Sequence, residues 1–139
     1  MDPSNNILSY LTSQLDGILV VDDQKFPVYS IAPRNKEKYV IINNPVFKDD
    51  SCYDDHEWEG LITIDILEYF KERGSYFNVN SISDQIQSAI IKKKWSIVNY
   101  AIIGGPFLFD SPTSSFEFEH GTEIKKSLII TFKIQKIGG

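Results

Sequence analysis

Two long stretches of strict alternation constrain the fold more than any other feature of this chain. Between Gly60 and Phe70, isoleucine recurs at every second position, and Thr63 and Asp65 stand between the isoleucines. Lys126–Ile137 repeats the pattern with aliphatic and aromatic residues against serine, threonine and lysine. A period of two is typical of a β-strand with one buried face. The chain is therefore predicted to form an antiparallel sheet whose second face is either solvated or an interface.

Two segments instead show the spacing of amphipathic helices. Apolar residues recur every three or four positions within residues 4–15 and within residues 81–95. Asp2 is the expected N-cap of the first helix, Gly17 is its expected end, and Ser81 is the expected N-cap of the second helix. Each helix is predicted to pack on the sheet through its apolar stripe.

Shorter apolar runs predict the remaining strands. They are Ile18–Val21, Phe26–Ile31, Lys38–Asn43, Val98–Phe109 and Ser115–Glu119. Asp22-Asp23 predicts a turn, and Gly104-Gly105-Pro106 predicts a bulge or bend. Phe116 and Phe118 are expected in the core or between sheets. The grouping of strands and helices predicts an α+β fold, mostly antiparallel, with both helices on one face and a single domain over residues 1–139.

The negative charge of the chain is concentrated in one stretch, KDDSCYDDHEWE, residues 48–59. The net charge is −5. This stretch holds six acids and one lysine, and the remainder holds 13 acids and 13 bases. A neutral-to-acidic chain is a poor candidate for binding nucleic-acid phosphates, which takes clustered lysine and arginine, and its one basic run, Lys92-Lys93-Lys94, is short.

Residues 48–59 are predicted to form a long loop between two strands, and long loops are commonly functional. Aromatic residues embedded among acids favour an interaction site over simple solvation. A solvated turn with a tucked tryptophan is the alternative interpretation. The candidate interaction residues are Asp49, Asp50, Tyr53, Asp54, Asp55, Glu57, Trp58 and Glu59.

No pattern in the sequence predicts a metal, cofactor or catalytic site. The acidic stretch lacks the glycine and ligand spacing of a calcium-binding loop. Cys52 and His56 could bind zinc only with partners from elsewhere, and His120 is the only other histidine. No nucleophile elbow or phosphate-binding loop occurs. The chain is therefore predicted not to be an enzyme and to carry no cofactor. Its single cysteine fits a reducing compartment.

The order of elements resembles the tail-completion or tail-terminator family of tailed bacteriophages, which includes head-tail joining and neck-ring proteins. In that family a helix precedes a strand, a loop, a second long strand, a helix and a closing β segment. The matching segments here are Ile7–Leu15, Tyr39–Ile42, Gly60–Leu67, Ser83–Ile91 and Ser127–Ile134.

This resemblance implies a virion structural protein without catalytic residues. It implies a homo-oligomeric ring in the neck or tail, assembled in the bacterial host cytoplasm without a membrane. Other virion proteins (portal, adaptor or tail proteins) would be its partners, and DNA would pass through the lumen without specific binding. The acidic stretch would then line a lumen that repels DNA, or form a charged docking rim.

Two other functions stay open at this level. One is a small bacterial α+β ligand-binding or enzymatic domain with a pocket between sheet and helices, near Asp65 or His120. The other is a cation-binding interaction module built on the acidic stretch.

Overall fold

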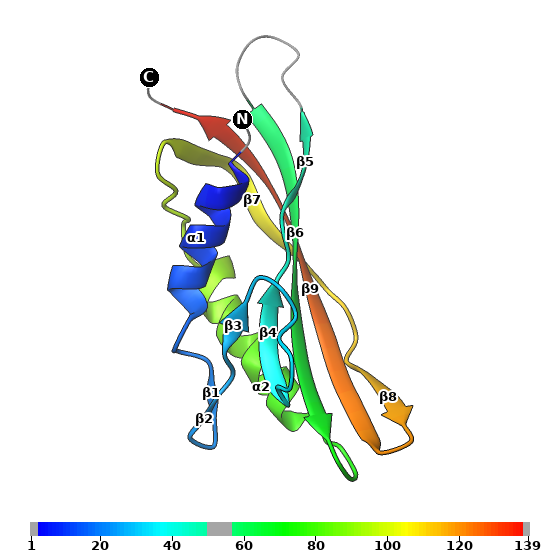
Figure 1. The fold of residues 1–139 in the computed structure, drawn as a ribbon. Coiled ribbons are helices and arrows are strands. Elements are labelled where there is room, and N and C mark those ends of the chain that lie inside the picture. Colours follow the sequence, from blue (N-terminus) through cyan, green and yellow to red (C-terminus); the bar gives the residue numbers. More distant parts are fainter. Residues whose placement is uncertain (1–2, 50–56, 138–139) are drawn as a thin grey trace.

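The computed structural model describes residues 3–49 and 57–137, and its fold is α+β (Figure 1). The helical elements are α1 (Ser4–Leu15), α2 (Phe77–Ile86) and the π-helical turn η1 (Gln87–Ile91). The strands are β1 (Val20–Val21), β2 (Gln24–Lys25), β3 (Val28–Tyr29), β4 (Lys38–Ile42), β5 (Val46–Asp49), β6 (Glu57–Phe70), β7 (Tyr100–Asp110), β8 (Ser114–Phe118) and β9 (Gly121–Lys136).

The long strands β6 and β9 form the centre of the main sheet and pair antiparallel along their whole length. On one side, β4 and β5 pair with successive parts of β6, and β3 joins β4 in parallel. On the other side, β8 and β7 pair with successive parts of β9. In the described part of the chain this is a mostly antiparallel sheet of seven strands. Strands β1 and β2 form a separate small hairpin.

The core lies between this sheet and the two helices, which cover one face (Figure 1). The sheet contributes the isoleucines predicted from the alternation, and Ile62, Ile64 and Ile66 are fully buried. Their cross-strand partners include Ile130 and Leu128, which are also fully buried. Burial of these side chains is the main stabilising term, at roughly 1.5–3 kcal/mol each.

Helix α1 follows its predicted boundaries. Ile7, Leu11 and Leu15 are fully buried, as expected for a stripe spaced by four residues. The helix ends at Leu15, and Gly17 adopts a φ of 82°, the left-handed conformation that glycine favours after a helix. Asp2, the expected N-cap, lies outside the described residues, so its capping role stays a prediction.

The predicted second helix, residues 81–95, was wrong at both ends. Helix α2 begins at Phe77, and the Ser75 hydroxyl accepts a hydrogen bond from the Phe77 N–H at 3.2 Å. Ser81 therefore lies inside the helix and is not its N-cap. The reason is Val79, which is fully buried and lies on the same helical face as Ile82, so the stripe starts one turn earlier.

At its other end, this helical segment changes geometry before it stops. The α-helix ends at Ile86 and continues as the π-helical turn η1 to Ile91. Trp95 lies beyond the helix but is still buried, and its indole N–H donates to the Ile90 carbonyl at 2.7 Å. The apolar residue that suggested a longer helix therefore packs from the following loop.

The predicted loop 48–59 is also too long. Lys48 and Asp49 belong to β5, and residues 57–59 belong to β6. The register pairs Lys48 with Glu59, so the antiparallel ladder extends into the acidic stretch. Backbone pairing with β9 on the other side of β6 explains why charged residues here are extended.

The predicted interruptions of the strands are confirmed. Asp22 and Asp23 both have positive φ, 50° and 63°, as in the turns that favour two-residue hairpins. Strand β7 changes register with β9 between Ile102 and Phe107, at the predicted Gly104-Gly105-Pro106 bulge. Gly105 there has a φ of 86°.

Candidate interaction surface

The sheet face opposite the helices, here called the open face, is covered by no helix of the described chain (Figure 1). Its side chains come from the odd-numbered residues of β6 and β9 and from their register partners. Alternation along each strand therefore determines which residues reach this face. The open face changes character from one end of the strands to the other.

An apolar band crosses the open face toward the end of the sheet where β5 and β7 lie. It consists of Val46, Leu61, Phe107 and Phe109, which are 67%, 38%, 63% and 61% exposed. Val46 pairs with Leu61, Leu61 pairs with Thr131, and Thr131 pairs with Phe107. These four residues therefore form one cross-strand row. Exposed apolar residues that are contiguous, and not scattered singly, mark interaction sites.

The middle of the open face is polar, and its groups are paired with one another. The Asp65 carboxylate accepts hydrogen bonds from Asn43 at 3.0 Å and from the Ser127 hydroxyl at 2.6 Å. Ser111 in turn donates to the Ser127 carbonyl at 2.6 Å and accepts from the Ser127 N–H at 3.1 Å. Since these groups already have partners, covering this region would cost less than covering unpaired groups.

At the opposite end of the open face is an aromatic cluster, here called the aromatic tip, formed by Tyr69, Phe116 and Phe118. The rings of Phe116 and Phe118 lie 4.7 Å apart, and those of Tyr69 and Phe118 lie 6.4 Å apart. The Tyr69 hydroxyl donates to the His120 carbonyl at 2.8 Å, which holds the ring against the β8–β9 turn. Phe116 and Phe118 are 62% and 48% exposed, so their predicted place in the core or between sheets was wrong.

Both ends of the open face carry charged side chains. Near the aromatic tip, Glu123 lies opposite Phe116, and Lys125 follows two residues along β9, whereas Glu117 pairs with Thr122 and lies on the other side of the β8–β9 hairpin. Next to the apolar band, the register places Lys48, Glu59 and Lys133 in one cross-strand row, and all three are exposed. The same end of the sheet also carries both ends of the acidic stretch, so lysines are not in excess there.

Partial burial of Tyr39 changes the pKa of its phenol. The Tyr39 ring lies on the open face beside Tyr29, with centroids 6.4 Å apart. Desolvation, and secondarily the negative charge of Glu123, raise the pKa of the Tyr39 phenol above its ordinary value. This part of the face therefore disfavours added negative charge.

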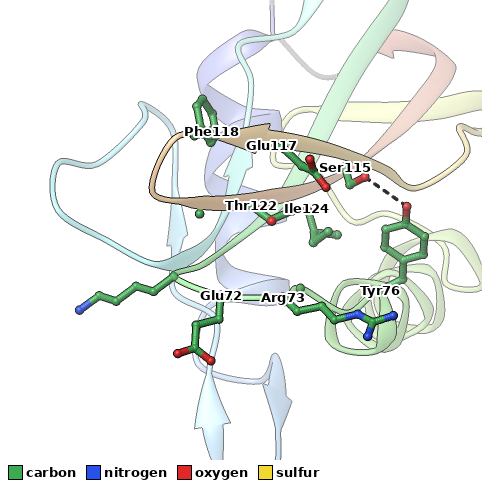
Figure 2. A pocket seen from close by; sticks show the side chains of 11 residues that line it. Glu72, Arg73, Tyr76, Ser115, Glu117, Phe118, Thr122 and Ile124 are labelled. Atoms are coloured by element: carbon green, nitrogen blue, oxygen red, sulfur yellow. Dashed lines mark hydrogen bonds between the residues drawn. The ribbon is translucent and has the colours of Figure 1, made fainter.

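A cavity of about 480 Å³ lies on the other side of the β8–β9 hairpin (Figure 2). Lys71, Arg73 and Tyr76 line it from the β6–α2 connection, and the Tyr76 hydroxyl is 3.3 Å from the Ser115 hydroxyl. Figure 2 shows Phe118 on the side of the hairpin away from Arg73. Neither Asp65 nor His120 lines this cavity. These are the two residues near which the ligand-binding interpretation of the sequence placed a pocket.

The structure describes only part of the predicted interaction site. Asp50, Tyr53, Asp54 and Asp55 lie outside the described residues, and of Asp49 only the backbone, in β5, is described. The other three residues start strand β6: Glu57, Trp58 and Glu59.

Trp58 is half-buried in this structure. Its ring packs edge-on against Tyr100, with centroids 6.0 Å apart, and against the core. Glu59, by contrast, is exposed on the open face, where it pairs in register with Lys48.

The sequence pattern did not predict that the apolar band and the aromatic tip are exposed. The alternation of Phe116 and Phe118 with Glu117 and Glu119 was visible, but it does not say which face of the strand is covered. Among residues 3–49 and 57–137, no group of three or more His, Cys, Asp or Glu side chains is arranged to hold a metal ion. None of the helices described is long and apolar enough to cross a membrane.

Comparisons with known proteins support the fold but no family. Neither the family models nor the curated proteins include a match to this chain. A solved structure titled "Virion of native gene transfer agent (GTA) particle" contains a chain of similar fold. The TM-score is 0.67 at 13% sequence identity, and the alignment covers 91% of this chain and 92% of that chain. The likeness therefore extends over nearly the whole fold.

Proposed function

We propose that this protein is a non-enzymatic structural subunit of a phage-like virion. The observation that carries the proposal is the shared fold with a chain of a gene transfer agent virion, which spans nearly all of both chains. The open face supports it, because a sheet face with an exposed apolar band and an exposed aromatic tip suits a protein that is covered on assembly.

Within a virion, the proposed place is the neck or tail. There the subunits would form a ring, as a head-to-tail connector or tail terminator, around the channel through which DNA passes. The resemblance in element order to tail-completion proteins supports this finer assignment. The portal, an adaptor or a tail protein would be the partners, and assembly would take place in the bacterial host cytoplasm.

The acidic stretch has a role in this proposal as the part of the ring that meets DNA or a partner. Its candidate residues are Asp49, Asp50, Tyr53, Asp54, Asp55, Glu57, Trp58 and Glu59. Strands β5 and β6 bring the two ends of this stretch together at one end of the sheet (Figure 1). Facing the channel, the carboxylates would repel DNA phosphates; facing outward, they would attract a basic partner.

The proposal is tested by localising the protein in particles. We expect gold-labelled antibodies to bind at the head–tail junction, and particles made without this protein to be defective in tail attachment. Cryo-electron microscopy of the purified protein with candidate partners should show rings. Particles of normal composition and infectivity or transfer activity without the protein would overturn the proposal.

The role of the acidic stretch needs a separate test. Changing Asp49, Asp50, Asp54 and Asp55 together to asparagine keeps the side-chain size and removes four charges. We expect weaker tail attachment or slower DNA passage. A matched control changes Asp22 and Asp23, which form an exposed turn elsewhere, to asparagine. Normal attachment and DNA passage in the fourfold variant would contradict this role.

A further inference from the structure

Two lysines share the helix-covered face of the main sheet with the buried carboxylate of Glu68. Glu68 is 5% exposed, and its Oε1 atom has no hydrogen-bond partner in the described structure. Lys38 of β4 lies directly opposite Glu68 in the register. Lys126 of β9 lies opposite Ile66, one step along the same face. A buried carboxylate oxygen thus stays unsatisfied although two cationic side chains lie close to it in the sheet.

The two lysines differ in how firmly they are held. The Lys126 ammonium lies 2.8 Å from the Asp110 carboxylate and donates to the Ser111 carbonyl at 2.9 Å. Lys38 instead donates to the side-chain carbonyl of Gln24, an exposed residue of β2. The contact with neutral Gln24 lacks the attraction between opposite full charges that holds Lys126. Lys38 is therefore the lysine that can more readily exchange its partner.

The register places the Glu68 carboxylate within reach of Lys38. The Tyr69 N–H donates to the Glu37 carbonyl at 2.6 Å. Residues 37 and 69 are therefore a hydrogen-bonded pair of the ladder, and Lys38 and Glu68 form the following pair, which is non-hydrogen-bonded. Side chains lie closest in pairs of this kind, whose Cα atoms are about 4.5 Å apart. The flexible four-carbon stem of lysine can cover such a separation without a change in the backbone.

From this we propose that Lys38 exchanges between two partners, Gln24 of the β1–β2 hairpin and Glu68 of β6. Each state leaves a different group without a partner. With Gln24, the buried Glu68 oxygen is unsatisfied; with Glu68, the ammonium is desolvated and Gln24 loses its bond. These opposing costs keep the two states close in free energy, so both are populated. The inference goes beyond the virion role and does not depend on it.

The exchange affects the tip of the β1–β2 hairpin and leaves its base in place. At the base, Leu19 and Phe26 are buried, and the Gln85 side chain bonds the N–H and the carbonyl of Val20 at 3.1 and 2.8 Å. At the tip, Gln24 is exposed and is held by Lys38. Release of Lys38 therefore frees the tip alone. A partner protein that contacts β2 would favour one of the two states.

Hydrogen exchange of the full-length protein, followed by mass spectrometry, tests this inference. Glu68→Gln keeps an acceptor for Asn78 and removes the charge that competes for Lys38. We expect the amides of residues 20–25 to exchange several-fold more slowly, relative to the amides of residues 62–66 in the core. If Glu68 merely stabilises the fold, both segments change by the same factor, and this outcome would overturn the inference.

Lys38→Met completes the test, because it keeps the apolar stem and removes the ammonium. The amides of residues 20–25 should then exchange several-fold faster, and adding Glu68→Gln should change them no further. Lys36→Met, on the exposed turn before β4, is the matched control and should exchange like the unsubstituted protein. If Glu68→Gln slows exchange equally with and without Lys38, the carboxylate acts through another group and the proposed exchange of partners is refuted.

Discussion

At the scale of single residues, Glu68 is a buried carboxylate whose hydrogen-bonding capacity is only partly satisfied. It is 5% exposed and lies on the helix-covered face of β6. One carboxylate oxygen accepts a hydrogen bond from Asn78 of α2 at 3.0 Å, and the other has no hydrogen-bond partner. A buried carboxylate with one partner depends strongly on that partner.

The first prediction therefore concerns Asn78. Asn78→Ala should lower the free energy of unfolding by about 2 kcal/mol, because it removes the one hydrogen bond to a buried carboxylate. Denaturant unfolding measures the change. Asn80→Ala, which removes an exposed hydrogen bond to Thr113, is the control and should cost less. The loss from Asn78→Ala should shrink in a Glu68→Gln background; an equal loss in both backgrounds would contradict this account.

Tyr39 gives a prediction on alkaline pH. Its pKa is raised in the folded state, so the folded protein retains the phenol proton more strongly than the unfolded chain. The resulting stability is present below the ordinary tyrosine pKa, about 10, and is lost as pH rises through the folded-state pKa. In Tyr39→Phe, the decline of the unfolding free energy above about pH 10 should be shallower.

Denaturant titrations at a series of pH values from neutral to alkaline measure this slope. The difference between Tyr39→Phe and the unsubstituted protein should be constant between neutral pH and pH 9, since the phenol is protonated in both states there. Parallel curves above pH 10 would show that burial of Tyr39 contributes nothing to the alkaline behaviour.

At the scale of elements, Gly60 of β6 is a point of close packing between a strand and the core. A Cβ atom there would lie 2.4 Å from the Phe132 ring and 2.8 Å from the Phe47 ring. These rings themselves pack edge-on, with centroids 6.0 Å apart. The absence of a side chain at Gly60 thus lets two aromatic rings from β5 and β9 fill the core beside β6.

Gly60→Ala should accordingly destabilise the protein by about 1–3 kcal/mol, because the core is overpacked at this point. Thermal or denaturant unfolding measures the loss. Gly104→Ala is a matched control within the sheet, since its Cβ would meet only the Lys133 side chain at an ordinary 3.5 Å. Phe132→Leu should recover part of the loss in Gly60→Ala. No recovery would mean that strain elsewhere is responsible.

At the scale of the whole molecule, the two faces of the main sheet have different environments. Helices α1 and α2 and the buried isoleucines make one face the core, whereas the open face carries apolar side chains without cover in the described chain. Stability and assembly are therefore separable by mutation. Substitutions on the open face should change assembly while leaving folding almost untouched.

Phe107→Asp tests this separation. Because Phe107 is 63% exposed, the free energy of unfolding should change by only about 0.5 kcal/mol. Self-association, measured by sedimentation at increasing protein concentration, should fall strongly. Val98→Asp, equally polar but on the covered side, should associate like the unsubstituted protein. Equal association of Phe107→Asp and the unsubstituted protein would show that the apolar band is not a contact.

Features that neighbouring residues impose could be predicted from the sequence alone. The alternation between Gly60 and Phe70 specified a strand with one buried face, and Gly17 and Asp22-Asp23 specified the end of α1 and a turn, because backbone conformation and side-chain direction are local properties. Two assignments made from the same patterns did not hold. The stripe of α2 began earlier, at Val79, and Trp95 packs from beyond the helix.

Which apolar residues are covered depends on long-range packing and could not be predicted from the sequence. Phe116 and Ile64 follow the same alternation, yet Ile64 is fully buried and Phe116 is largely exposed. The difference arises because helices distant in sequence cover one side of the sheet only, and because β8 presents Phe116 on the other side. A local pattern records that a strand has two faces; long-range packing decides which face becomes the core and which is left for a partner.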